Sequence, residues 1–145
     1  MKENFKMRKK LALYYATDVS TKQMSQEKAK LMEADTLIEI REVQQRSAFN
    51  IMTSGMIEAM RGKKSEIEPI DADFNDYRTI IIFMPLWGGN PAPAMNSVID
   101  LIPEGKEIEL YMISAKGKSM KSADNTSNEI QKRGSLVTKY VDIKV

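Results

Sequence analysis

The sequence predicts a single α/β domain over residues 1–145, an open three-layer α/β/α sandwich around a five-stranded parallel sheet. Apolar runs of strand length alternate along the chain with stretches of helical spacing, an alternation typical of parallel sheets. The chain has 145 residues, enough for one domain, and its hydrophobic fraction of 42% and charged fraction of 29% are ordinary for a globular protein.

Five apolar runs are predicted to be strands. The runs 11–16, 79–84 and 108–113 are continuously apolar or nearly so, which is typical of buried parallel strands. The run 36–40 alternates in part and is expected nearer an edge of the sheet, and the run 136–143 is the last strand.

Helical spacing follows the first four predicted strands, over about 21–33, 51–60, 92–102 and a weaker, polar stretch at 124–133. The first of these helices offers four residues to its inner face: Met24, Ala29, Leu31 and Met32. Ser20 or Thr21 is expected to cap it, with Gln23 as the return partner, and Gly62 is placed to end the second helix.

The composition limits the chemistry that the side chains can supply. The chain has no cysteine and no histidine, so thiolates, disulfides and the commonest general base are all absent. Any reaction then depends on carboxylates, hydroxyls, lysines or a bound cofactor, and a cofactor is the expectation. The net charge of +2 gives no strong field for binding nucleic acid.

The apolar run 11–16 is too short for a signal peptide or a membrane span, so a soluble cytoplasmic protein is expected. The basic cluster before it is interpreted as a solvated tail over residues 1–9: Lys2, Lys6, Arg8, Lys9 and Lys10.

The loop at 84–97 carries Trp87, the only tryptophan, and follows a buried strand. Open α/β sheets bind their ligands at the carboxyl ends of strands, so this loop is a candidate binding site. Trp87 either caps the core or offers a flat apolar surface to a planar heterocycle, for which stacking contributes about 1–3 kcal/mol.

Asp76-Tyr77, residues 80–90 (IIIFMPLWGGN) and residues 91–95 (PAPAM) resemble the flavodoxin-like family, in which a Pro-x-Trp loop lies against the flavin of FMN. The resemblance covers about residues 10–143 and implies the strand order 2-1-3-4-5, with the cofactor crevice between strands one and three. The family's closing helix is missing after the fifth strand, which suggests a partly bare sheet face and a homodimer.

By this resemblance, the loops after strands one, three and four meet at one edge of the sheet and bind FMN. The first loop would bind the phosphate, the second would bind one side of the flavin ring, and the third would lie against the other side of the ring. The implied residues are Thr17, Ser20, Thr21 and Lys22; Pro85, Leu86, Trp87, Gly88, Gly89 and Asn90; and Ser114, Ala115, Lys116 and Gly117. Lys116 and Lys118 would place positive charge near the flavin or form a solvated basic turn.

The first loop departs from the family pattern Ser/Thr-x-Thr-Gly-Asn-Thr, which corresponds to residues 16–21. Thr21 is kept, but Asp18 stands at a hydroxyl position and Val19 at the glycine. A carboxylate about 4 Å from a phosphate repels it by about 4 kcal/mol near a protein surface. FMN is compatible with this loop if Asp18 turns outward to cap the helix and Lys22 supplies a counter-charge; otherwise the loop is an ordinary helix cap.

The resemblance implies an FMN-binding redox protein, either an electron carrier or a small FMN-dependent oxidoreductase such as a quinone or flavin reductase. Its partners would be a redox protein or a small-molecule electron acceptor. The alternative is a flavodoxin-fold protein that has lost FMN and acts as a binding or interaction module. A phosphoacceptor receiver domain is excluded because no acidic residue ends the third strand, and G-x-G-x-x-G and G-x-S-x-G motifs are absent.

Overall fold

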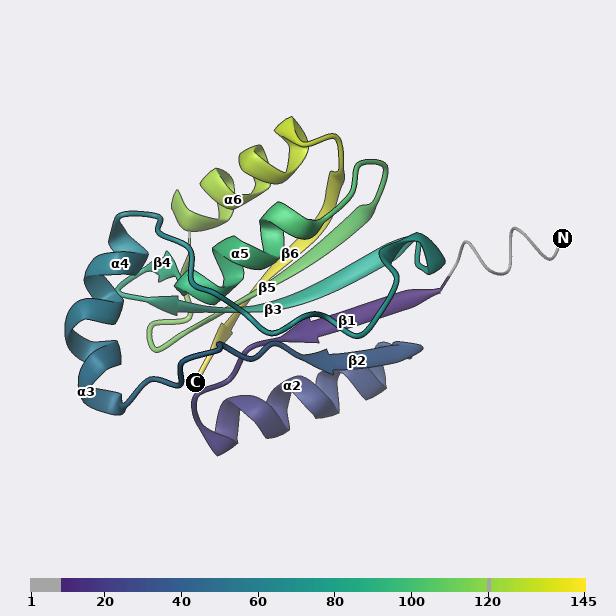
Figure 1. Ribbon diagram of the computed structural model, residues 1–145. Coiled ribbons are helices and arrows are strands. Elements are labelled where there is room, and N and C mark those ends of the chain that lie inside the picture. The colour runs from purple at the N-terminus through teal and green to yellow at the C-terminus, as the bar shows by residue number, and fades with distance from the viewer. Residues whose placement is uncertain (1–8, 120) are drawn as a thin grey trace, which may run out of the picture.

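The computed structural model describes residues 9–119 and 121–145 (Figure 1). Of the predicted basic tail, Lys2, Lys6 and Arg8 therefore lie outside the described residues. Lys10 belongs to the first strand, where its backbone N–H donates to the Asp35 carboxylate at 2.8 Å.

One sheet organises the molecule, and its five long strands run parallel in the order β2-β1-β3-β5-β6. In chain order these strands are β1 (Lys10–Tyr14), β2 (Thr36–Glu39), β3 (Thr79–Trp87), β5 (Glu107–Ser114) and β6 (Leu136–Lys144). This is the order 2-1-3-4-5 expected from the sequence. One short strand was not predicted: β4 (Asn90–Pro91) folds back antiparallel onto the end of β3, which is why β3 continues past residue 84.

Helices cover both faces of the sheet, which confirms the three-layer arrangement (Figure 1). One face carries α2 (Val19–Leu31), and the other carries α5 (Pro93–Leu101) and α6 (Lys121–Lys132). Pro93 stands in the first turn of α5, where its missing N–H costs no hydrogen bond. No helix among residues 9–119 and 121–145 is both long enough and apolar enough to cross a membrane.

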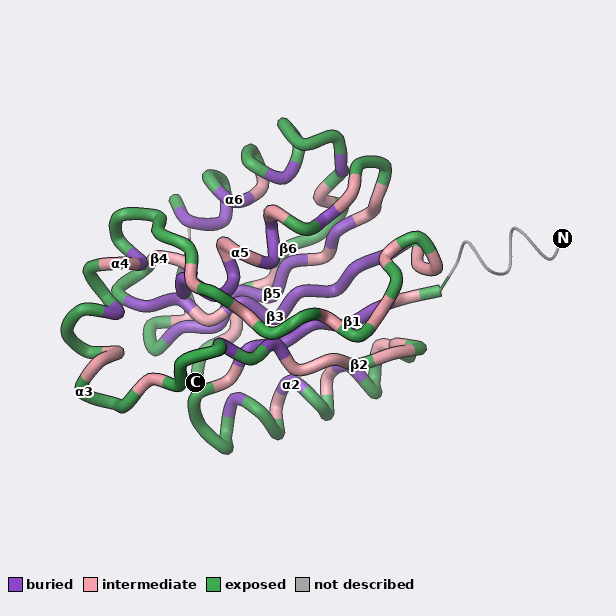
Figure 2. The backbone as a smooth tube through the Cα atoms, in the orientation of Figure 1, coloured by how far each residue is buried: buried purple, intermediate pink, exposed green. Residues whose placement is uncertain are grey.

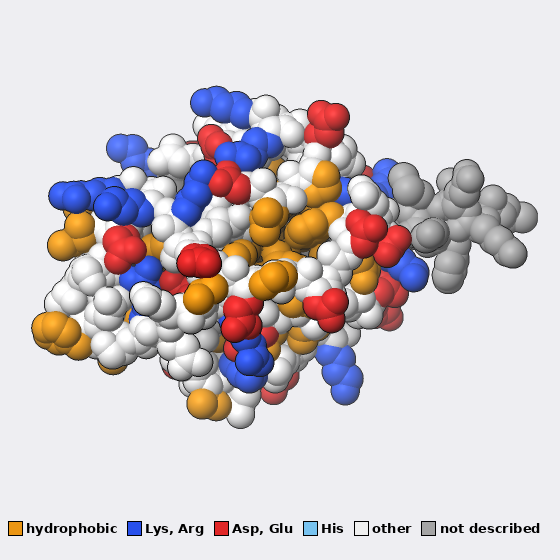
Figure 3. Space-filling view, viewed as in Figure 1, with side chains coloured by type: hydrophobic (Ala, Val, Ile, Leu, Met, Phe, Trp, Pro, Cys, Tyr) orange, Lys and Arg blue, Asp and Glu red, His pale blue; other side chains and the backbone are white. Residues whose placement is uncertain are grey.

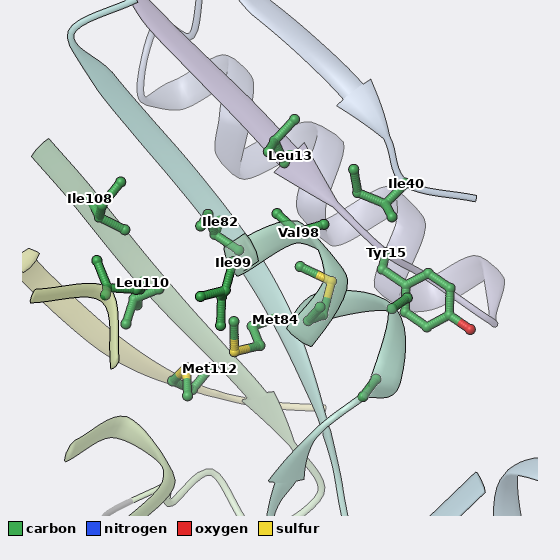
Figure 4. Close-up of a cluster of buried hydrophobic side chains, with 14 of the residues drawn as sticks. Leu13, Tyr15, Ile40, Ile82, Met84, Val98, Ile99, Ile108, Leu110 and Met112 are labelled. Atoms are coloured by element: carbon green, nitrogen blue, oxygen red, sulfur yellow. The ribbon is translucent and has the colours of Figure 1, made fainter. Parts of the chain in front are cut away.

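The core has two parts because successive residues of a strand point to opposite faces. In β1, Leu11 and Leu13 pack under α5, whereas Ala12 and Tyr14 pack with Ala29 of α2. Figure 2 shows the buried residues concentrated in the central strands, and Figure 4 shows the larger cluster between β1, β3, β5 and α5.

The α2 face is the less covered of the two. Among the described helices, only α2 contributes to the hydrophobic cluster on that face, and β6 is partly exposed along its length. The sequence-based expectation of a partly bare face agrees with this exposure, while the homodimer inferred from it stays a prediction.

Two details of α2 differ from the sequence-based prediction. Asp18 caps the helix instead of Ser20 or Thr21, so the helix begins at Val19. Leu31, predicted to face inward, is 82% exposed. The inner face instead repeats every four residues through small side chains, which allow the helix to approach the sheet closely: Thr21, Ser25 and Ala29.

A second group of helices lies at the carboxyl edge of the sheet, beyond the arrow tip of β3 in Figure 1. It runs without a break through α3 (Ala48–Asn50), the π-helix η1 (Ile51–Gly55) and α4 (Met56–Met60), and we call it the edge helix. Gly62 ends it at a φ of 65°, as predicted. A single 3-10 turn, η2 (Phe74–Asp76), precedes β3.

Candidate functional site

The loops after β1, β3 and β5 open at the same edge of the sheet because these strands are parallel and adjacent. The first two are in contact, since the rings of Tyr15 and Trp87 have centroids 6.0 Å apart. The Ser122 hydroxyl, which follows the third loop, donates to the Gly89 carbonyl. The three loops therefore lie together at this edge of the sheet, as predicted.

In the first loop, Asp18 turns toward the helix that follows. Its carboxylate accepts the Thr21 backbone N–H at 2.7 Å and the Thr21 hydroxyl at 3.0 Å. Ser20 and Thr17 are exposed, and Val19 is a helical residue that needs no left-handed backbone. The Lys22 ammonium lies 3.4 Å from Glu39, so its nearest counter-charge is a carboxylate of β2.

In the second loop, Pro85, Leu86 and Trp87 belong to β3, and Asn90 to β4. Gly88 and Gly89 make the turn with φ values of 59° and 84°, a backbone conformation that favours glycine. The Trp87 side chain is only 7% exposed and belongs to the larger hydrophobic cluster, so the indole is not an open platform in this structure.

The third loop is a polar turn. The Ser114 hydroxyl accepts the Gly117 backbone N–H at 2.9 Å. Ala115, Lys116 and Lys118 are exposed, and neither lysine forms an ion pair within the described part of the chain. The geometry here is that of a solvated basic turn.

A buried ionic cluster beside Trp87 was not predicted. The Tyr15 hydroxyl donates to the Glu42 carboxylate, and Arg46 Nε donates to the same carboxylate at 2.9 Å. The other end of the Arg46 guanidinium donates to Glu58 of α4 at 3.1 and 3.2 Å, and Nη1 also donates to Asn50 Oδ1 at 2.9 Å. The only signal for this cluster in the sequence is the i, i+4 spacing of Glu42 and Arg46.

These contacts fix the charge states of the cluster. Burial, and then the hydrogen bond to Glu42, raises the pKa of Tyr15 far above its ordinary value. Hydrogen bonding to Glu58 raises the pKa of Arg46, and Arg46 in turn lowers the pKa of Glu58. At neutral pH the tyrosine is therefore neutral, Arg46 is a cation and Glu58 is an anion.

A pocket of about 420 Å³ opens next to this cluster, within the size range of small-molecule sites. It lies between the first loop and the segment after β2, and its charged residues balance as three cations and three carboxylates: Lys22, Arg41, Arg46, Glu39, Glu42 and Glu68. Of the predicted site residues, Thr17 and Lys22 line it, while Ser20, Thr21 and the predicted residues of the second and third loops do not; Asp18 does not line it either.

Several hydrophobic side chains of the edge helix are exposed, and Figure 3 shows some of them standing apart among polar atoms where α3 and α4 lie. The exposed ones are Phe49, Met52, Met56, Ile57 and Met60. Elsewhere on this face, acidic and basic side chains are interspersed, in line with the small net charge.

No protein-family model and no curated protein sequence matches the chain. Several solved structures resemble it. A flavoprotein from Lactobacillus acidophilus NCFM, solved in complex with FMN, superposes with a TM-score of 0.74 at 24% identity, covering 92% of this chain and 91% of its own. The apo-form of the flavoprotein from that organism gives a TM-score of 0.65 at 22% identity, covering 93% of this chain and 93% of its own.

A candidate flavoprotein from Bacteroides uniformis ATCC 8492 gives a TM-score of 0.80 at 16% identity, covering 97% of this chain and 94% of its own. At these identities the likeness establishes the architecture. Together with the strand order and the converging loops, it shows that this chain has the flavodoxin-like fold.

Proposed function

We propose that this protein binds FMN at the carboxyl edge of its sheet and acts as a redox flavoprotein. The observation that carries the proposal is the meeting of three loops at that edge, where the aromatic pair Tyr15 and Trp87 lies beside a polar pocket. The likeness to an FMN complex from Lactobacillus acidophilus supports it.

The residues present fit the cofactor in two respects. The Asp18 carboxylate is held by the amide and hydroxyl of Thr21 and does not line the pocket, although its charge still acts at the start of α2. Thr17 and Lys22 do line the pocket and offer a hydroxyl and an ammonium group. Ser20, Thr21 and the start of α2 would complete the phosphate site, since helix N-termini favour anions.

The ring of the flavin would lie against Tyr15 and Trp87, and the turn at Gly88, Gly89 and Asn90 would face its polar edge. Pro85 and Leu86 hold this turn in place as part of β3. Ser114, Ala115, Lys116 and Gly117 would lie on the other side of the ring. When bound, FMN supplies one- and two-electron transfer between a donor and an acceptor.

The side chains themselves bind, orient and set charge. Tyr15 stays protonated at neutral pH because burial and Glu42 raise its pKa, so it contributes an aromatic wall and no exchangeable charge. The exposed Lys116 and Lys118 add positive charge at the edge, which favours an anionic form of a bound ring. Electron carriage and a reductase activity toward a small acceptor are both compatible with this site, in a cytoplasmic protein.

The second candidate function is an interaction module that has lost FMN. It is favoured by one specific observation: the Asp18 carboxylate already occupies the start of α2. An anion bound there would compete with that cap.

Titration with FMN separates the two candidates. Flavin fluorescence should fall as the protein is added at micromolar concentration, because a ring in contact with Tyr15 and Trp87 is quenched. Riboflavin should bind more weakly, since it lacks the phosphate, and Trp87→Leu should weaken both ligands equally. A variant at the opposite edge of the sheet, Arg78→Gln, is the control and should bind as the parent does. Unquenched flavin at tens of micromolar protein would favour the interaction module.

A further inference from the structure

We propose that Arg46 is the gate of this site, covering Trp87 in the closed protein and leaving when a planar ligand binds. The inference rests on the proposed function, because the ligand that it admits is the flavin ring. It concerns a residue that no sequence pattern singled out.

Arg46 lies over the indole. Its guanidinium carbon is 5.3 Å from the centroid of the Trp87 ring, a cation–π distance, and its side chain is 9% exposed. A Cβ built at Gly55 would lie 3.2 Å from Trp87 Cζ3 and 3.3 Å from Arg46 Nη1. The edge helix, the indole and the guanidinium therefore meet with no room for another ring between them.

Arg46 also separates two hollows. The pocket of about 420 Å³ described above and a second one of about 380 Å³ share three lining residues: Glu42, Val43 and Arg46. The first hollow continues to Thr17 and Lys22, and the second to Glu58 and the segment 64–66. Since Arg46 belongs to the wall that both share, moving its side chain would join them beside the indole.

The two carboxylates that hold the gate differ in exposure. The Glu42 side chain is almost fully buried, whereas that of Glu58 is 30% exposed. Water competes more effectively for the partly exposed contact, so the Arg46–Glu58 pair is the half that opens. Glu58 belongs to α4, directly after the π-helix η1, and such π-helical turns interrupt the regular helix hydrogen bonding at functional sites.

Three variants test the gate while keeping charge and position apart. Glu58→Gln weakens the Arg46–Glu58 pair without changing a residue of the first pocket. Arg46→Lys keeps the positive charge but loses the planar guanidinium that donates to both carboxylates, and Arg46→Gln removes the charge as well. Arg78→Gln removes an exposed Arg–Glu pair, with Glu107, and is the matched control. Each variant is checked by circular dichroism, and Glu58→Gln serves if an Arg46 variant does not fold.

Two readouts are needed. Acrylamide quenching of Trp87 emission without ligand should rise in all three gate variants and stay unchanged in the control. The FMN association rate and affinity should rise by about tenfold in Glu58→Gln and Arg46→Lys, because a larger fraction of the protein is open.

Other outcomes overturn the gate. Weaker FMN binding in Arg46→Gln with unchanged binding in Arg46→Lys would make Arg46 a cationic contact to the ligand. Unchanged quenching and affinity in every variant would make the cluster purely structural. A different result separates the two proposals: if quenching rises but none of the proteins binds FMN, Arg46 still covers Trp87 and it is the proposed function that fails.

Discussion

Asp18 allows the sharpest prediction about the site, because two of its properties can be removed separately. Its carboxylate accepts the Thr21 amide at 2.7 Å and the Thr21 hydroxyl at 3.0 Å, and it adds a negative charge at the start of α2. Asp18→Asn keeps a side-chain oxygen for the amide and removes the charge. Asp18→Ala removes the cap as well.

The expected magnitudes follow from these contacts. Loss of an N-cap costs about 1 kcal/mol, and loss of a favourable charge at the helix start costs about 0.5 kcal/mol. Asp18→Ala should therefore lower the free energy of unfolding by about 1.5 kcal/mol, and Asp18→Asn by about 0.5 kcal/mol. Removal of the charge should raise FMN affinity about tenfold in Asp18→Asn at low salt, and the gain should shrink as salt screens the phosphate.

Chemical unfolding followed by the emission of Trp87 gives the stability, and flavin fluorescence at two salt concentrations gives the affinity. Ser20→Ala is the control for stability, because Ser20 does not cap the helix. Arg78→Gln, at the opposite edge of the sheet, is the control for affinity. Equal losses of stability in both Asp18 variants would contradict the capping geometry. An affinity that Asp18→Asn leaves unchanged would mean that no phosphate binds at the start of α2.

Three further predictions concern the surroundings of the site. Gly55→Ala gains up to about 1 kcal/mol of helix propensity but places a methyl 3.0 Å from the Asn50 carbonyl and 3.2 Å from Trp87, so unfolding experiments should show a net loss of about 1 kcal/mol; a gain would mean loose packing there. Arg46 holds the pKa of Glu58 below its ordinary 4.5. The free energy of unfolding that Glu58→Gln loses should therefore be largest above pH 4.5 and fall to zero as the pH drops through the lowered pKa, which denaturation at several pH values measures. Burial, and then Glu109, raises the pKa of Tyr111 to about 12, so absorbance at alkaline pH should show it ionising there, with stability lost between its ordinary 10.0 and 12; the difference from Tyr111→Phe isolates this residue.

The sheet was predictable because its strands are continuously apolar and its helices and loops alternate with them. Which face of α2 packs against the sheet was not predictable, since the small residues Thr21, Ser25 and Ala29 face the sheet while Leu31 points to solvent. Hydrophobicity alone favours the opposite orientation for Leu31.

The site was predictable in its location and less so in its contents. The Pro-Leu-Trp-Gly-Gly-Asn loop identified the edge, and parallel topology brought the other two loops to it. Arg46 and Glu58 are 12 residues apart and meet because Arg46, just before the edge helix, reaches Glu58 in α4. Contacts of this kind depend on tertiary packing and leave no local pattern in the sequence.

The central claim is that FMN binds at the carboxyl edge of the sheet. Backbone amide NMR of the labelled protein during FMN titration tests it most directly, because glycine amides are well separated and lie at both edges. We predict shifts for Gly88, Gly89 and Gly117, with no change at Gly105 and Gly134, whose backbone groups pair with each other at the opposite edge. Shifts confined to Gly105 and Gly134, or none at saturating FMN, would contradict the account.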